Sequence, residues 1–191
     1  MNCEGMKEHP MSKPDDRRQC WQTPPDFWGV IHAEFNFMVD AAANKSNALC
    51  GVWYGPGSAW AEDALADNFQ WSHNAAGNIY CNPGFANLSP WCKRAYETVN
   101  NFGSAVALTC SFAIMVLCHP STKWWAFCVQ HAYEIRLLAP RPQFIAAPGI
   151  KQSSNSHENA LVIFRRVPRN WPGAMIWTWQ WKKGGTSDEQ T

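Results

Sequence analysis

Residues 78–85 read Asn-Ile-Tyr-Cys-Asn-Pro-Gly-Phe and combine two kinds of local structure in one short segment. Asn78 to Cys81 is a β-prone run, and Asn82 to Phe85 contains residue types that form tight turns. Ser89 and Pro90 then predict a helix start, because serine caps helices and proline suits the first turn. The order strand, loop, helix is the repeating unit of an α/β fold.

The preceding segment predicts a helix followed by a strand. Thr23-Pro24-Pro25-Asp26 has the pattern of a helix start that Thr23 caps. A short β-prone run from Phe35 to Val39 then ends at Asp40, and the small residues Ala41 to Ala43 follow it. Two such units in succession favour parallel strands joined by helices.

Further strands and helices are expected downstream. The helix after Ser89 should bury Trp91 and Ala95, and a third helix should begin with Ser121 as its cap. The expected strands are residues 112–118, 133–138, 160–164 and 175–181, and residues 146–159 are expected to form a loop. The sequence therefore predicts a mostly parallel α/β sheet with helices on both faces.

The composition indicates one folded domain without a membrane span. The chain has 191 residues, of which 46% are hydrophobic and 16% charged, and its net charge of +1 does not indicate a nucleic-acid partner. Its longest apolar run, residues 105–118, is too short to cross a bilayer, and the polar N-terminus is no signal peptide. We expect a cytoplasmic protein with a single domain at 20–181 and flexible tails at 1–19 and 182–191.

Cysteine and tryptophan are both abundant. The 8 cysteines lack CxxC spacing and several lie in apolar segments, so we expect buried thiols rather than disulfides or metal ligands. The 12 tryptophans could form the core or stack on flat ligands such as nucleobases. Trp177, Trp179 and Trp181 alternate along an expected strand, and we interpret them as sheet packing.

The turn Asn82-Pro83-Gly84-Phe85 carries groups that can hold a flat amine. The Asn82 side-chain oxygen and the Pro83 carbonyl could accept both hydrogens of an exocyclic NH2 group, and Phe85 could stack on the ring that bears it. Hydrogen bonds of this kind direct the nitrogen lone pair toward an electrophile without a metal or a covalent nucleophile. An ordinary Asn-Pro-Gly turn is the alternative interpretation.

Several segments around this turn resemble, in the same order, the motifs of one enzyme family. Upstream and at the turn they are Trp21-Gln22-Thr23-Pro24, Phe37 to Ala43, Glu62-Asp63-Ala64-Leu65 with Trp71, and Tyr80 to Phe85. Downstream they are Phe112 to Cys118, Ser121 to Trp125, His131 to Arg136, Arg141 to Phe144, and Ala160 to Phe164. Over roughly residues 20–166 the chain is similar to the phage DNA N6-adenine methyltransferases, which are Dam-like amino-methyltransferases with an N-P-P-Y motif.

The resemblance implies a Rossmann-like methyltransferase with S-adenosylmethionine as its methyl donor. It implies that Asn82, Pro83 and Phe85 are catalytic. It implies that Thr23, Pro24, Asp40, Ala41 and Asp63 bind the donor. The local sequence leaves simpler roles open. Thr23 could do no more than cap its helix, Asp40 could cap a helix or form a turn, and Asp63 could be the carboxylate at the start of a helix.

The resemblance also implies a substrate and a setting. The partner would be DNA whose target adenine is flipped out of the helix or single-stranded. No segment is long enough for a separate recognition domain, so short or relaxed sequence specificity is expected. Such enzymes mark phage or prophage DNA in a bacterial host and protect it from restriction.

Two departures from the family motif keep alternatives open. Gly84 replaces the second proline, which loosens the loop that holds Asn82, and Phe85 replaces the tyrosine. The same acceptors could also serve the N4 amine of cytosine. A catalytically weakened relative that binds DNA or another partner is the third possibility. The sequence predicts neither the recognition sequence nor the oligomeric state.

Overall fold

The computed structural model describes residues 21–71, 77–100, 111–146, 158–166 and 171–182. Three helices lie within these ranges: α1 (Pro25–Phe35), α2 (Ser89–Asn100) and α3 (Lys123–His131). The strands are β1 (Phe37–Asp40), β2 (Val52–Trp53), β3 (Asn78–Cys81), β4 (Ser111–Leu117), β5 (Glu134–Ala139), β6 (Asn159–Arg165) and β7 (Met175–Gln180).

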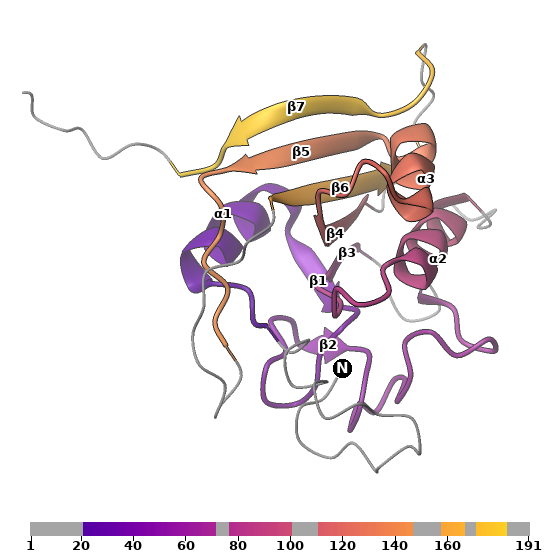
Figure 1. Ribbon diagram of the computed structural model, residues 1–191. Helices are drawn as coiled ribbons and strands as arrows, with labels where there is room; N and C mark the ends of the chain where they lie inside the picture. The colour runs from indigo at the N-terminus through magenta and orange to yellow at the C-terminus, as the bar shows by residue number, and fades with distance from the viewer. Residues whose placement is uncertain (1–20, 72–76, 101–110, 147–157, 167–170, 183–191) are drawn as a thin grey trace, which may run out of the picture.

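The seven strands form one mixed sheet in the order β2-β1-β3-β4-β6-β5-β7 (Figure 1). Strands β2, β1, β3 and β4 run parallel to one another, and β5 pairs in parallel with β7. Strand β6 lies between β4 and β5 and is antiparallel to both. The prediction of a mostly parallel α/β sheet is therefore confirmed.

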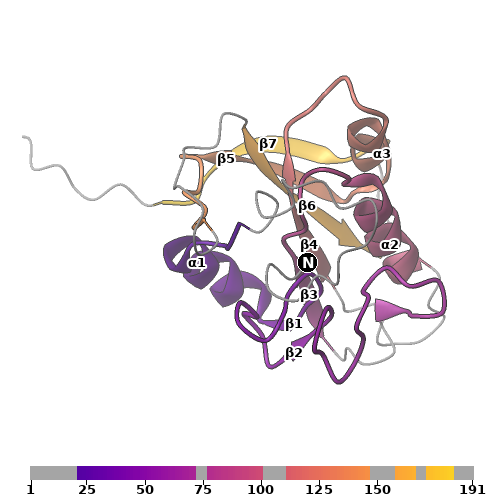
Figure 2. The same cartoon turned by 60° about the horizontal axis from the view of Figure 1, so that its bottom comes forward.

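Alternate residues of the central strands pack toward opposite faces. Phe112, Ile114 and Val116 of β4 join an apolar cluster that contains the buried residues of α2 and α3. Ala113 and Met115 join a second cluster that contains the buried residues of α1. Figure 2 shows α1 on one side of the sheet and α2 and α3 on the other, so the expectation of helices on both faces is confirmed.

Two predicted helix caps are wrong by one residue. Helix α1 is preceded by Pro24 and has no side-chain cap, because the Thr23 hydroxyl bonds instead to Tyr80 and Asn82. Helix α3 is capped by Thr122, whose hydroxyl accepts a hydrogen bond from the Trp125 N–H, and not by Ser121. Neighbouring serine and threonine residues have similar capping preference, so sequence alone does not separate them.

The end of α1 differs from the prediction, and one strand was not predicted. Helix α1 continues to Phe35, which the sequence assigned to the following strand, because Phe35 is buried on the same helical face as Phe27 and Ile31. Strand β2 was not predicted, since two residues are too short to show an alternating pattern. Most of the expected loop at 146–159 and of the expected tails lies outside the described residues.

The described cysteines all have free thiols. Cys81, Cys92 and Cys128 are buried, as the sequence predicts, and burial raises the pKa of the Cys81 thiol well above its usual range. Cys50 and Cys118 are half-buried. No helix of the described residues is long and apolar enough to span a membrane.

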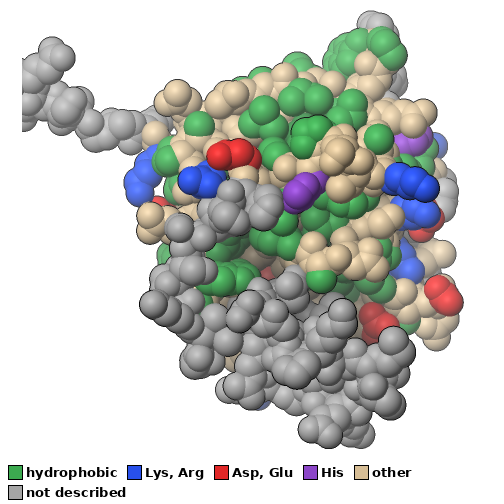
Figure 3. Space-filling view, in the orientation of Figure 1, with side chains coloured by type: hydrophobic (Ala, Val, Ile, Leu, Met, Phe, Trp, Pro, Cys, Tyr) green, Lys and Arg blue, Asp and Glu red, His purple; other side chains and the backbone are tan. Residues whose placement is uncertain are grey.

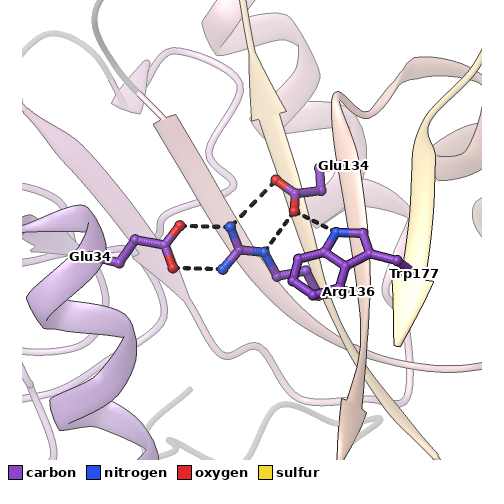
Figure 4. A network of polar contacts seen from close by, with 4 residues as sticks. All are labelled: Glu34, Glu134, Arg136 and Trp177. Carbon is purple, nitrogen blue, oxygen red and sulfur yellow. Dashed lines mark hydrogen bonds and ion pairs between the residues drawn. The ribbon is translucent and has the colours of Figure 1, made fainter. Parts of the chain in front are cut away.

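A network of charged side chains joins α1 to the far end of the sheet (Figure 4). Arg136 of β5 donates two hydrogen bonds of 2.6 Å to the Glu34 carboxylate of α1, and its Nε donates to Glu134 Oε1 at 2.8 Å. The Trp177 indole N–H of β7 donates to the same Glu134 oxygen at 2.7 Å. The sequence analysis did not predict this network, which links three elements through one buried guanidinium.

The three tryptophans that the sequence assigned to sheet packing, in and just after β7, differ in how far they are buried. Trp181 is buried, Trp179 packs against the α1-side cluster, and Trp177 remains 39% exposed despite its hydrogen bond. Met175 and Ile176 are also exposed on this strand. Figure 3 shows hydrophobic side chains gathered at the top of the molecule, where β7 and β5 lie in Figure 1.

Replacing Arg136 should destabilise the fold. In Arg136→Met the buried Glu134 carboxylate loses its cation, and we expect the free energy of unfolding in urea to fall by about 3 kcal/mol. Lys182→Met is the matched control, because it removes an exposed ion pair with Asp26 and should cost less than about 1 kcal/mol. Equal effects of the two substitutions would contradict a structural role for the network.

Candidate active site

Three segments that are distant in sequence meet beside the carboxyl end of β3. Asn82 follows β3, and its side-chain amide donates a hydrogen bond of 2.9 Å to the Trp21 carbonyl. Gln22 pairs with Ile145 through two backbone hydrogen bonds of 2.9 Å. The carboxyl ends of parallel strands form the edge at which open α/β sheets bind ligands, so this is the candidate active site.

The Asn82 amide is oriented by two acceptors. Its Nδ2 donates to the Trp21 carbonyl and, at 3.2 Å, to the Thr23 hydroxyl oxygen. A carbonyl can only accept, so the NH2 end of the amide must face Trp21 and the oxygen must face away. Within the described part of the chain, no group donates a hydrogen bond to Asn82 Oδ1. The amide therefore presents an acceptor with a fixed direction.

Tyr80 supports this arrangement from within β3. Its hydroxyl lies 2.7 Å from the Thr23 hydroxyl, and both side chains are buried. Burial raises the pKa of the Tyr80 phenol well above its usual range, so its hydroxyl group remains protonated and neutral. Tyr80, Thr23 and Asn82 thus form a continuous hydrogen-bonded chain from the sheet to the candidate site.

Asp40 ends β1, the strand next to β3, and is almost completely buried. Its carboxylate accepts hydrogen bonds from the N–H groups of Ala42 at 3.3 Å and Leu49 at 3.2 Å. Burial raises the pKa of Asp40 from 3.8 to about 6, although the bonds from Leu49 and Ala42 act to lower it. The two N–H groups leave lone pairs on both oxygens for a further hydrogen-bond donor.

The other predicted site residues near β3 are buried or half-buried. Ala41 is buried, and its N–H donates to the Tyr80 carbonyl at 2.8 Å, which joins the ends of β1 and β3. Pro24 and Pro83 are buried as well. Phe85 is half-buried and meets Phe144 edge to face, with ring centroids 6.0 Å apart. The structure thus places the 141–144 segment beside the turn that contains Asn82.

Asp63 lies on a separate loop and is exposed. Its carboxylate accepts a hydrogen bond of 2.8 Å from the Leu65 N–H, which forms a local turn, and no helix begins there. Arg94 of α2 holds this loop by donating to the carbonyls of Leu65, Ala66 and Phe69. The described contacts do not join Asp63 to Asn82, so its role in donor binding stays a prediction.

The sequence analysis missed three groups that shape the site. The Trp21 carbonyl and the Tyr80 hydroxyl orient Asn82 and Thr23, and Arg94 fixes the loop of Asp63. A buried tyrosine hydroxyl needs a hydrogen-bond partner, so the position of Tyr80 near the end of an apolar strand could have indicated a polar contact there. Backbone carbonyls and a helical arginine carry no comparable signal. The described residues contain no cluster of three His, Cys, Asp or Glu side chains that could hold a metal ion.

Comparison with known proteins identifies the family. The model of the family described as DNA N-6-adenine-methyltransferase (Dam) matches residues 11–183, which is most of the chain. The chain therefore belongs to this family. A search of curated proteins gives no significant match.

The buried Asp40 carboxyl should make stability depend on pH. Its folded pKa of about 6 exceeds the ordinary value of 3.8, so between these pH values the folded protein binds the proton more tightly than the unfolded chain. The contribution of Asp40 to the free energy of unfolding should fall as pH rises through this window, by at most about 1.4 kcal/mol per pH unit. It should then be constant at higher pH.

Asp40→Asn removes this titration and serves as the reference. Urea unfolding of both proteins between pH 4 and pH 7 gives the difference in the free energy of unfolding at each pH. We expect the native protein to lose stability relative to the variant as pH rises. A difference that does not change across the window would show that Asp40 has an ordinary pKa.

Proposed function

We propose that this member of the Dam family transfers a methyl group from S-adenosylmethionine to the N6 amine of adenine in DNA. Family membership supports DNA N6-adenine methylation in general. The observation that carries the specific proposal is the Asn82 amide, whose nitrogen donates to Trp21 and Thr23 while no described residue donates to its oxygen. An outward-facing acceptor oxygen fits the NH2 group of the target base, which has two N–H hydrogen-bond donors.

Asn82 and Pro83 would hold the target amine. The Asn82 Oδ1 atom and the Pro83 carbonyl accept one amine hydrogen each, and the nitrogen lone pair then points away from both acceptors. Phe85 stacks on the purine ring, with its own ring supported at the edge by Phe144. Because Trp21 and Thr23 fix the amide before the base arrives, little reorganisation accompanies the reaction.

Asp40 and Ala41 would bind the methyl donor, together with Thr23, Pro24 and Asp63. The site fits a donor that carries hydroxyl and amine groups, because both Asp40 oxygens retain lone pairs and the adjacent alanines allow close approach to the backbone. Bound S-adenosylmethionine supplies an electrophilic methyl group on a sulfonium. The amine nitrogen would form a bond to the methyl carbon as the carbon–sulfur bond breaks, S-adenosylhomocysteine would be the leaving group, and the amine proton would pass to solvent.

The wider setting follows from the same proposal. The target base must leave the helix or be single-stranded, because its amine has to reach Asn82. We also propose a Rossmann-like sheet, short or relaxed sequence specificity, and a role in protecting phage or prophage DNA from restriction. The sheet order and the site at the carboxyl ends of β1 and β3 support the first of these proposals.

Replacing Asn82 should abolish methylation without unfolding the protein. With methyl-labelled S-adenosylmethionine and DNA, nucleoside analysis should detect N6-methyladenine for the native chain. Asn82→Ala should reduce the rate at least about 100-fold, because the transition state loses a fixed acceptor. Asn68→Ala is the matched control, since Asn68 is an exposed loop residue, and it should leave the rate unchanged.

The other outcomes decide between the alternatives. If the product is N4-methylcytosine, the target base is cytosine and not adenine. No product and no donor binding would refute the enzymatic proposal and favour a non-catalytic relative in which Gly84 has weakened the motif. Full activity in Asn82→Ala would refute the catalytic assignment of this residue.

A further inference from the structure

Trp60 is a large apolar side chain that the proposed function does not use. It is 49% exposed, the largest exposed fraction of any aromatic residue among those described as exposed large hydrophobics. It belongs to the loop 55–61, which follows β2 and contains no helix or strand. A tryptophan held in solvent on an ordered loop presents a flat apolar surface to a ligand.

The loop that carries Trp60 is fastened by Ser58. The Ser58 hydroxyl donates to the Trp53 carbonyl at 2.6 Å and accepts from the N–H groups of Trp60 at 3.0 Å and Ala61 at 3.3 Å. The Gly55 N–H donates to the Ala61 carbonyl at 2.8 Å, which closes the loop at its base. These bonds fix the backbone at Trp60, so little entropy is lost when the indole binds a ligand.

The base of this loop lies against the segment that follows β1. Gly55 has a φ angle of 142° and approaches Ala43 so closely that an added Cβ would lie 2.1 Å from its carbonyl oxygen. Ala43 follows the donor-site residues Asp40 and Ala41 in sequence. Because β1, β2 and β3 are parallel, the loop that follows β2 and the turn that follows β3 leave the same edge of the sheet.

The charges beside Trp60 favour contact with a base over contact with a phosphate. Glu62 and Asp63 lie two and three residues after it and are exposed, so they repel the DNA backbone. A nucleobase is flat and uncharged, and stacking on an indole does not depend on its sequence. A base next to the target has an exposed face once the target leaves the stack.

We propose that Trp60 is a stacking site for an unpaired DNA base beside the methylated adenine. The proposal rests on the proposed function, because it takes the bound DNA to have an extruded or single-stranded target. Trp60 makes no contribution to the chemical step. It holds the strand at the edge of the sheet that carries Asn82.

Single-stranded oligonucleotide binding tests this proposal without the methyl donor. Trp60→Ala should raise the dissociation constant for the oligonucleotide roughly 5- to 150-fold, which is the usual effect of removing one aromatic side chain on which a base stacks. Trp60→Phe should retain most of the affinity, because phenylalanine also stacks. The matched control is Trp171→Ala, since Trp171 is 41% exposed but precedes β7 at the opposite edge of the sheet, and it should bind as the native chain does.

Donor binding and methylation separate the remaining outcomes. Trp60→Ala should bind S-adenosylmethionine normally and should raise KM for DNA with little change in kcat. Unchanged DNA affinity, or a loss confined to donor binding, would overturn the proposal, and the second result would place the adenosyl group on Trp60 instead. A native chain that binds DNA through Trp60 but forms no methylated base would refute the proposed function, and with it the placement of the stacked base beside a methylated adenine. Unchanged DNA affinity of Trp60→Ala, when the native chain does methylate adenine, would refute this proposal alone.

Discussion

The hydrogen bonds from the Asn82 amide to the Trp21 carbonyl and the Thr23 hydroxyl are the constraint on which the candidate site depends. They connect the segment before α1 to the end of β3, and they decide which end of the amide faces outward. Tyr80 extends the chain into the buried sheet through its bond to Thr23. Part of the rigidity of the turn that contains Asn82 and Gly84 therefore comes from outside that turn.

Local patterns predicted most of the secondary structure but not the long-range polar contacts. Strand β3 was predicted from a short β-prone run, and the buried face of α2 from apolar spacing, because burial on one helical face leaves a periodic signal. The Asn82–Trp21 bond spans 61 residues and the Arg136–Glu34 pair spans 102, and no local pattern encodes either contact. Thr23 shows the consequence, since its expected role as a cap is local and its observed bonds are distant.

Several of the segments that carry the family resemblance meet in the structure. The structure brings the 21–24, 80–85 and 141–145 segments together at one edge of the sheet, through Asn82, Gln22 and Phe144. Asp63 is different, because an exposed carboxylate on a loop is positioned by neighbours such as Arg94 that the motif does not contain. Abundant tryptophan was a poor guide to function, and exposure on a fixed loop singles out Trp60.

The central claim is that Thr23 and Trp21 orient Asn82 so that its oxygen receives the target amine. Single-turnover methylation with saturating donor and DNA tests it in a double-mutant cycle of Thr23→Val and Asn82→Ala, with Thr23→Ser as the conservative variant. Thr23→Ser should retain the native rate, Thr23→Val should be about tenfold slower, and Thr23→Val should have no further effect once Asn82 is alanine. A native rate in Thr23→Val, or an equal loss in both backgrounds, would contradict the account.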